Sequence, residues 1–227
     1  MTQLPPALSS GSVQEGRISQ AAREDERRRQ VLAALTDVFA KRGYQAATVE
    51  NLIAGAKISM GGFYKFFEGK EDCFVQVYER VVELALQRMR AELPAGADWA
   101  TQAIVGTRAL VEFAAERPLA AKVVVLEAQT GGAEALRRYV ATVREAAAFL
   151  RRGREEGMLG ERLPANFEDS TASGLVWLFQ TRLARGGIDD PDELHPQIAK
   201  VVLEPYLGPA RAEGLLRAAD DEHAASK

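Results

Sequence analysis

Two short helical segments, separated by only about three residues, constrain this 227-residue chain more than any other feature. Thr48 precedes the first segment and Ser59 the second. Threonine and serine side chains accept hydrogen bonds from the free N–H groups at a helix start, so both residues mark a helix beginning. The first segment is about two turns long, with an apolar face of Val49, Leu52, Ile53 and Ala56. Two short capped helices this close together are typical of a helix-turn-helix.

The second segment reads SMGGFYKFF and has an unusual composition for a helix that serves only the core. Gly61 and Gly62 each cost a helix about 0.8 to 1 kcal/mol relative to alanine. Glycine lets a helix backbone approach another group closely, and that group can be a phosphate. The hydroxyl of Tyr64 and the ammonium of Lys65 suit phosphate oxygens. The segment is therefore predicted to approach a polyanion, while the two phenylalanines at 63 and 67 pack inward.

Helical periodicity also dominates the rest of the chain. A helix is expected from Arg23 to Gly43, and a long helix from Gly69 to Leu93 joins two domains. Residues 1–22 lack a sustained apolar period and are expected to form a flexible arm. Such an arm either has no function of its own or contacts DNA. Beyond Pro94, glycines and prolines separate a series of segments with helical periodicity. The apolar segment from Val123 to Leu126 is too short, and too closely flanked by helix-forming residues, to predict a strand.

Charge and composition limit the partners and the compartment. The formal net charge is -3, yet residues 1–70 carry 10 Lys/Arg against 7 Asp/Glu, so the N-terminal end is where a polyanion would dock. Cys73 is the single cysteine and is expected to be buried without a disulfide. Apolar runs are too short to cross a bilayer and the opening lacks the pattern of a signal peptide, so the protein is expected in the cytoplasm without membrane contact.

The sequence favours no enzyme class. It offers no nucleophile with a base, no phosphate-binding loop after a strand and no metal-ligand spacing. His195 and His223 lack partner patterns, and His195 is expected at the surface or at a helix start. We therefore expect no catalytic residue, no cofactor and no metal. An enzyme and a helical scaffold without DNA binding are the alternatives from other classes.

Residues 43–74, GYQAATVENLIAGAKISMGGFYKFFEGKEDCF, resemble the DNA-binding segment of the tetracycline-repressor (TetR) family of bacterial regulators. The resemblance extends in detail over about residues 25–80. The positions in register with the family's motif are Gly43, Tyr44, Thr48, Val49, Ile58, Ser59, Gly61, Phe63, Tyr64, Phe67, Lys70 and Glu71. The resemblance implies an all-α protein with an N-terminal three-helix helix-turn-helix head and a C-terminal helical ligand-sensing and dimerisation domain.

For the head, the resemblance implies that the helix from Ser59 to Phe66 enters the major groove of DNA. Phosphate contacts are implied at Thr48, Tyr64 and Lys70. Lys57 replaces a common turn glycine, while Ala47 and Gly62 replace frequent hydroxyl residues, which leaves Met60 and Lys65 as the main base readers. The predicted DNA-contacting residues are Tyr44, Thr48, Lys57, Ser59, Met60, Gly61, Gly62, Tyr64, Lys65 and Lys70.

For the C-terminal part, the resemblance implies a pocket for a small-molecule effector and a pair of helices that join two subunits. The candidate pocket residues are Trp99, Phe113, Leu126, Gln129, Tyr139, Phe149, Trp177 and Gln180. The candidate dimer residues, on the segments 165–187 and 192–208, are Leu175, Leu178, Phe179, Arg182, Ile198, Val202 and Tyr206. Sequence periodicity leaves open which of these simply fill the core.

The domains expected are a flexible arm at 1–22, a DNA-binding domain at 23–70, a regulatory and dimerisation domain at 71–219 and a tail at 220–227. The resemblance implies a homodimeric transcription regulator that binds palindromic double-stranded operator DNA. A repressor released by a small molecule is the expected form. An activator, or a regulator without a ligand, is the alternative within the same fold.

Overall fold

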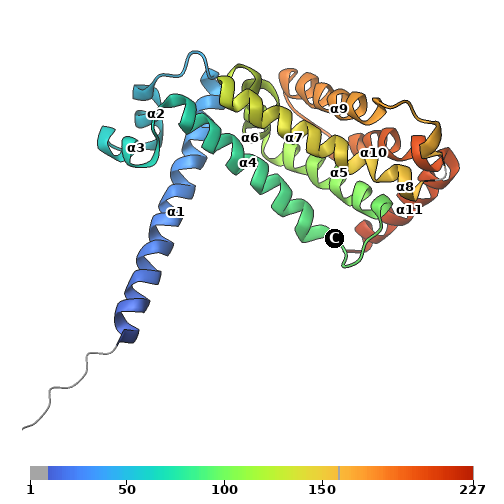
Figure 1. Ribbon diagram of the computed structural model, residues 1–227, viewed down its shortest axis with the longest axis horizontal. Helices are drawn as coiled ribbons and strands as arrows, with labels where there is room; N and C mark the ends of the chain where they lie inside the picture. The colour runs from blue at the N-terminus through green and yellow to red at the C-terminus, as the bar shows by residue number, and fades with distance from the viewer. Residues whose placement is uncertain (1–9, 158, 227) are drawn as a thin grey trace, which may run out of the picture.

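The computed structural model describes residues 10–157 and 159–226, and these residues form helices without any strand. Four helices build the N-terminal head and its connection: α1 (Ser10–Arg42), α2 (Val49–Ala56), α3 (Met60–Phe66) and α4 (Lys70–Glu92). Figure 1 shows α2 and α3 at one end of the molecule, with α4 running from them into the larger helical part. The predicted all-α class, the two short helices and the long connecting helix are thereby confirmed.

The C-terminal part is a bundle of helices packed side by side. Its elements are α5 (Trp99–Glu116), α6 (Pro118–Lys122), η1 (Val123–Glu127), η2 (Ala128–Thr130), α7 (Ala133–Arg151), α8 (Gly153–Glu156), η3 (Gly160–Arg162), α9 (Phe167–Ala184), α10 (Pro191–Leu207) and α11 (Pro209–Ser226). Helix α10 packs mainly on α5 and α11, whereas α9 packs on α7 (Figure 1). No described helix is long and apolar enough to span a bilayer.

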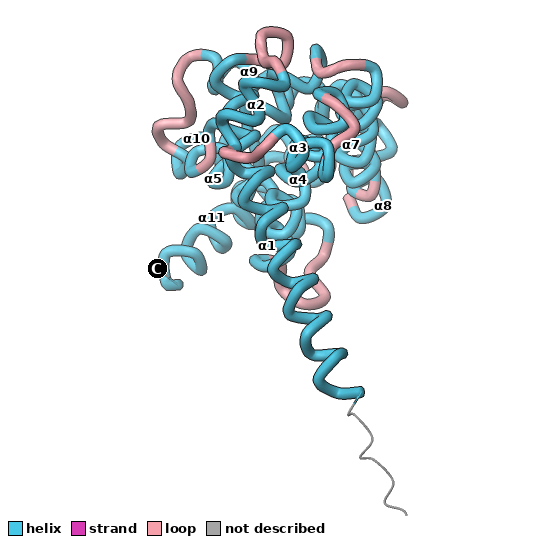
Figure 2. Tube along the Cα trace, turned by 90° about the vertical axis from the view of Figure 1, so that its left-hand side faces the viewer, coloured by secondary structure: helices cyan, strands magenta, loops and turns pink. Residues whose placement is uncertain are grey.

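Helix α1 begins much earlier than the periodicity predicted. It starts at Ser10 instead of Arg23, so residues 10–22 are helical where a flexible arm was expected, and residues 1–9 lie outside the described part. Figures 1 and 2 show this N-terminal half projecting away from the packed helices. Residues 22–30 of this helix are all exposed, and an exposed helix needs no apolar face in its sequence.

The core of the head continues into the C-terminal part. Leu35, Phe39 and Phe74 are fully buried in it, together with Val123 of η1 and Ala128 of η2. Phe74 makes edge-to-face contacts with the rings of Phe39 and Tyr44 at centroid distances of 5.0 and 5.1 Å. Head and regulatory part therefore share buried apolar surface, which ties the orientation of one to the other.

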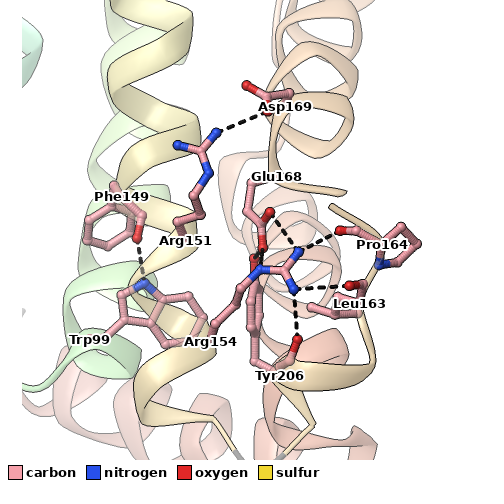
Figure 3. Close-up of polar contacts among 10 residues, drawn as sticks. Trp99, Phe149, Arg151, Arg154, Leu163, Pro164, Glu168, Asp169 and Tyr206 are labelled. Atoms are coloured by element: carbon pink, nitrogen blue, oxygen red, sulfur yellow. Dashed lines mark hydrogen bonds and ion pairs between the residues drawn. The ribbon is translucent and has the colours of Figure 1, made fainter. Parts of the chain in front are cut away.

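A buried ion pair fixes the far end of the C-terminal part (Figure 3). The Glu168 carboxylate of α9 is 0% exposed and accepts hydrogen bonds from the Arg154 guanidinium, at 2.7 and 3.0 Å, and from the Tyr206 hydroxyl, at 3.0 Å. Burial alone would raise the pKa of Glu168, but the hydrogen bonds from Arg154 and Tyr206 hold it below its usual range. The same guanidinium donates to the carbonyls of Gly160, Leu163 and Pro164, so one side chain connects α9 to the loop before it.

The structure corrects three of the predicted dimer residues. Ile198, Val202 and Tyr206 are 1 to 2% exposed inside the protomer, where α10 packs on α5 and α11, so they belong to the core. Leu175, Leu178 and Phe179 are half-buried against the same core, and Arg182 is exposed. The predicted tail also differs, because α11 continues to Ser226 and Asp220 forms an ion pair with Arg108 of α5.

Candidate nucleic-acid interface

Helix α3 presents an open face to solvent at the end of the molecule (Figure 1). Met60 and Tyr64 are 49% and 56% exposed and lie one turn apart, so their side chains share one side of the helix. Lys65 is exposed beside them, and a Cβ atom on Gly61 would meet no heavy atom within 4 Å. Phe63, on the opposite side, is fully buried. The exposed face thus offers an apolar side chain, a phenol, an ammonium and bare backbone.

Both short helices begin as the sequence predicts. The Thr48 hydroxyl accepts from the Asn51 N–H, and the Asn51 side chain accepts from the Thr48 N–H, each at 3.3 Å. The Ser59 hydroxyl accepts from the Gly62 N–H at 3.0 Å. Gly62 therefore lies against its own cap, and its Cβ position is 3.2 Å from Ser59 Oγ, which explains a small residue there without any DNA. The reciprocal role of Asn51 escaped the sequence analysis because asparagine is uncommon at that position.

Lys57 takes the backbone path that a turn glycine would take. It ends α2 with φ 53° and ψ 45°, the left-handed conformation, and is the one described non-glycine residue with positive φ. Its N–H bonds back to the carbonyls of Ile53 and Ala54. The departure from the family's glycine therefore leaves the turn intact and adds an exposed ammonium between α2 and α3.

Tyr44 and Lys70 lie inside the head and not on the face of α3. Tyr44 is buried, with its ring stacked near Phe39, and burial raises the pKa of its phenol. The Lys70 ammonium donates to the carbonyls of Tyr44 and Ala47 at 3.1 and 3.0 Å and lies 4.4 Å from the centre of the Tyr44 ring. Both residues hold the loop before α2 in place, and the DNA contact predicted for Tyr44 does not fit its burial.

The same loop is held from the C-terminal part. Gln45 donates through its side-chain amide to the Thr130 carbonyl at 2.9 Å, and the Tyr44 N–H donates to the Glu127 carboxylate. A second contact of this kind involves α4, where the Glu71 carboxylate accepts a hydrogen bond from the Glu134 N–H of α7 at 3.1 Å. Sequence reasoning missed Glu127 because its partner lies 83 residues away and no local pattern marks such a pair.

Residues 31–77 match the family described as bacterial regulatory proteins, tetR family. This match places a DNA-binding domain of the tetR family at residues 31–77 of the chain. Two curated relatives are the transcriptional regulator HbdR of Aromatoleum sp. (strain CIB), 29% identical over 69 residues, and the transcriptional activator FasR of Mycolicibacterium smegmatis, 35% identical over 69 residues. These matches cover 30% of this chain and 30% and 32% of the relatives, so the chain spans about a third of the length of each.

Solved structures of bacterial regulators resemble the chain over most of its length. The fatty acid degradation regulator FadR of Bacillus halodurans has a TM-score of 0.67 at 18% identity and covers 77% of this chain and 96% of its own. The Bacillus subtilis FadR in complex with stearoyl-CoA has a TM-score of 0.61 at 18% identity and covers 78% and 97%. At such identities these similarities establish the fold, an N-terminal helix-turn-helix followed by a helical domain. The named relatives are regulators, none of them an enzyme.

In the C-terminal part, the eight predicted pocket residues do not gather around one cavity. Trp99 is fully buried and donates from its indole N–H to the Phe149 carbonyl at 3.0 Å (Figure 3), whereas Trp177 is 64% exposed. Gln129 pairs with the Tyr139 hydroxyl at 3.3 Å, and Gln180 donates to the Val125 carbonyl at 2.6 Å. Phe113 is buried and Leu126 half-buried in other parts of the helical domain.

A cavity that the described residues do form lies elsewhere, between α4, α5, α10 and α11. Its volume is about 800 Å³. Its wall combines apolar side chains with charged ones: Arg88, Glu92, Pro94, Thr101, Ile104, Val105, Arg108, Glu112, Ala115, Glu116, Pro191, Asp192, Leu215, Ala218, Ala219, Glu222 and His223. None of the eight predicted residues is among them. Surface charges on helices gave no signal for a cavity, because helices of any soluble protein carry such residues.

Proposed function

We propose that this TetR-family chain is a DNA-binding transcription regulator that docks α3 in the major groove. The observation that carries the proposal is the open face of α3, where Met60, Tyr64 and Lys65 project from a rigid, capped helix. Lysine donates to the acceptors of guanine, and methionine makes apolar contact with a thymine methyl. Thr48 and Ser59 stand at helix N-termini, whose free amides favour phosphate. Gly61 allows the backbone to approach the duplex.

The test is selection of fragments from the protein's own genome with the full-length chain at physiological salt. We expect a preferred palindromic sequence, because two copies of α3 would read related half-sites. Met60→Ala and Lys65→Ala should change the preferred sequence, at about 1 to 3 kcal/mol for a good base contact. Tyr64→Phe should weaken binding to every sequence alike. Arg217→Ala on α11 is the matched control for Lys65→Ala, since both remove one exposed cation.

Selection that yields no preference over random DNA would overturn this function and favour a helical scaffold. A preference that Met60→Ala and Lys65→Ala leave unchanged would place base recognition on another element. Because the relative FasR is named an activator, the direction of regulation needs its own measurement. We propose repression, tested by a reporter placed behind the selected sequence, and increased expression in the presence of the protein would show activation.

We propose further that two chains pair through the outer sides of α9 and α10. Trp177 of α9 and Val201 of α10 are 64% and 54% exposed, which is unusual for large apolar side chains on folded helices. Arg182 and the exposed parts of Leu175, Leu178 and Phe179 belong to the same helix as Trp177. A self-complementary surface of this kind is what a two-fold dimer requires.

We propose that a small-molecule effector occupies the cavity beside α4 and lowers the affinity for DNA. Arg88 and Glu92, near the end of α4, line this cavity, while Lys70 at the start of α4 is bonded to the loop of the head. A ligand that prefers one tilt of α4 therefore changes the spacing of the two α3 helices. The coupling is reciprocal and typically 1 to 3 kcal/mol, about 5- to 150-fold in affinity.

Stearoyl-CoA and stearate are the first probes, because stearoyl-CoA occupies the Bacillus subtilis neighbour. Ala218→Trp should narrow the cavity from α11, whereas Ala210→Trp, exposed on the same helix outside the cavity, is the control. We expect Ala218→Trp alone to abolish release from DNA while operator binding stays normal. Equal release in both variants would move the effector out of this cavity. An effector whose affinity is unchanged by bound operator would remove the regulatory mechanism.

A further inference from the structure

The N-terminal half of α1 lies outside the domain that the family shares. The match begins at Val31, whereas α1 begins at Ser10, so 21 residues of helix precede it. At 1.5 Å per residue this is roughly 30 Å of additional helix. Every residue from 22 to 30 is exposed, and Figures 1 and 2 show the segment projecting past α3. A helix without a packed face gains little stability from its own residues, so a partner would be needed to hold it.

Two contacts establish which side of α1 faces the helix-turn-helix. The Lys65 ammonium of α3 lies 3.8 Å from the Glu24 carboxylate of α1. Further along α1, Val38 faces α2, since a Cβ atom on Gly55 would lie only 2.3 Å from Val38 Cγ2. Arg27 precedes Val38 by 11 residues, or about three turns, and therefore lies on the same side of the helix. Arg23 lies one turn before Arg27 on that side.

The other charged side chains of this segment are either paired or on other sides of the helix. Arg28 donates to the Gln76 side chain of α4 at 2.5 Å, and Arg29 is paired with Glu26 at 2.7 Å. Glu24 is paired with Lys65, as above. Asp25 lies two residues from both Arg23 and Arg27, which on a helix places it on the opposite side. The side that α1 shares with α2 and α3 therefore carries a pair of exposed guanidinium groups, Arg23 and Arg27.

We propose that this half of α1 is a second DNA-contacting element, in which Arg23 and Arg27 bind phosphates of the duplex next to the site of α3. The inference rests on the proposed function, since it continues the same DNA-facing side beyond the shared domain. Guanidinium groups bind phosphate oxygens in a bidentate manner and position the protein without reading sequence. The element thus adds affinity and lengthens the protected stretch of DNA, and it leaves the preferred bases to α3.

The experiment compares the full-length chain with the double variant Arg23→Gln/Arg27→Gln on the selected operator over a range of salt concentrations. We expect the variant to bind with the same preference, a salt slope lower by about 2 and a shorter nuclease footprint. Arg29→Gln is the matched control, because Arg29 is exposed on the same segment but paired with Glu26. Unchanged melting temperatures should confirm that all variants fold.

The outcomes separate the two proposals. A wild-type slope and footprint in the double variant, while Lys65→Ala still weakens binding, would overturn this inference and leave the proposed function intact. A loss of slope of the same size in Arg29→Gln would also overturn it, because general electrostatics would then explain the result. If the full-length chain shows no preference for any sequence over random DNA, the proposed function itself is wrong.

Discussion

The Glu127 carboxylate accepts a hydrogen bond from the backbone N–H of Tyr44, with 2.8 Å between Oε2 and the amide nitrogen. Glu127 ends the π-helix η1, and Tyr44 lies in the loop that leads into α2. In the same π-helix, the Val125 carbonyl accepts from the Gln180 side chain of α9 at 2.6 Å. One five-residue segment therefore contacts both the DNA-binding head and a helix proposed to form the dimer.

Glu127→Ala should loosen this connection. The Tyr44 N–H would lose its acceptor in a half-buried place, and leaving such a donor unsatisfied costs about 1 to 3 kcal/mol. We expect a lower melting temperature and faster hydrogen exchange at the Tyr44 amide. Glu127→Gln keeps an acceptor oxygen and should behave much like the wild type. Equal exchange rates in Glu127→Ala and the wild type would show that the bond does not protect this amide in solution.

Replacing Lys57 should separate stability from DNA binding. A non-glycine residue in the left-handed conformation is strained, so Lys57→Gly should keep or raise the free energy of unfolding by up to about 1 kcal/mol. Lys57→Ala retains the strain and should gain nothing. Both variants lose the ammonium and should lower the salt slope of DNA binding by about 1. Unaltered slopes in both would exclude Lys57 from the interface.

Lys70→Ala is expected to act on the fold of the head. The ammonium bonds two carbonyls of the loop before α2, and hydrogen bonds to charged groups are worth about 1.5 to 3 kcal/mol each. Denaturant unfolding should show a clear loss of stability, and Lys70→Arg should recover part of it. If Lys70→Ala unfolds like the wild type but has a lower salt slope, Lys70 binds phosphate instead, as the family resemblance implies.

A charge at Trp177 and a charge at Ile198 should have different consequences. Trp177→Arg places the charge on an exposed surface, so we expect a folded protein that sediments as a monomer. Ile198→Arg buries an unpaired charge at a site only 2% exposed and should destabilise the protomer itself. Circular dichroism and sedimentation distinguish these results. A stable dimer of Trp177→Arg would place the interface on other helices.

His195 should make stability depend on pH. Its Nε2 lies 3.2 Å from the Ile104 carbonyl, and Nδ1 has no hydrogen-bond partner among the described residues. Burial lowers the pKa of His195 from 6.5 to about 4, helped by the nearby Arg108. The unfolded chain therefore takes up a proton first, and stability present above pH 6.5 declines as the pH falls towards 4, by about 3 kcal/mol at ~1.4 kcal/mol per pKa unit.

His195→Phe is the comparison for this pH effect. The carboxylates of the chain titrate in both proteins, so the difference between their unfolding curves isolates the histidine. We expect the variant to lose less stability between pH 6.5 and 4. Parallel pH profiles would mean that His195 is protonated equally in the folded and unfolded chains.

The sequence predicted the parts of the fold that depend on local chemistry. Thr48 and Ser59 cap α2 and α3 as their hydroxyls suggest, and Cys73 is buried. His195, expected at the surface or at a helix start, lies near the start of α10 but is fully enclosed. Histidine is compatible with either environment, and only the packing of α5 against α10 decides between them.

Long-range packing explains the remaining differences. Ile198 and Trp177 are both large and apolar, and periodicity cannot tell a face that meets another helix of the same chain from one left open. The cavity escaped prediction for a related reason, since Arg88 and Arg108 become neighbours only when α4, α5 and α11 come together. Likewise, the helix-forming neighbours of the valines at 123–125 argue against a strand, but only the surrounding packing determines that these residues form a π-helix.

The π-helix also makes the register of the following helices depend on the exact number of residues in this segment. Pro118 to Thr130 is almost continuous helix, and a π turn holds one more residue than an α turn. Removing a single residue from Val123–Glu127 would let the ordinary helix continue, but everything after the deletion would rotate by about 100° relative to what precedes it. Glu127 could then no longer keep its present register with both α6 and Tyr44. The extra residue thus acts as a spacer, and homologues that differ in length here would have to join the two domains through another side chain.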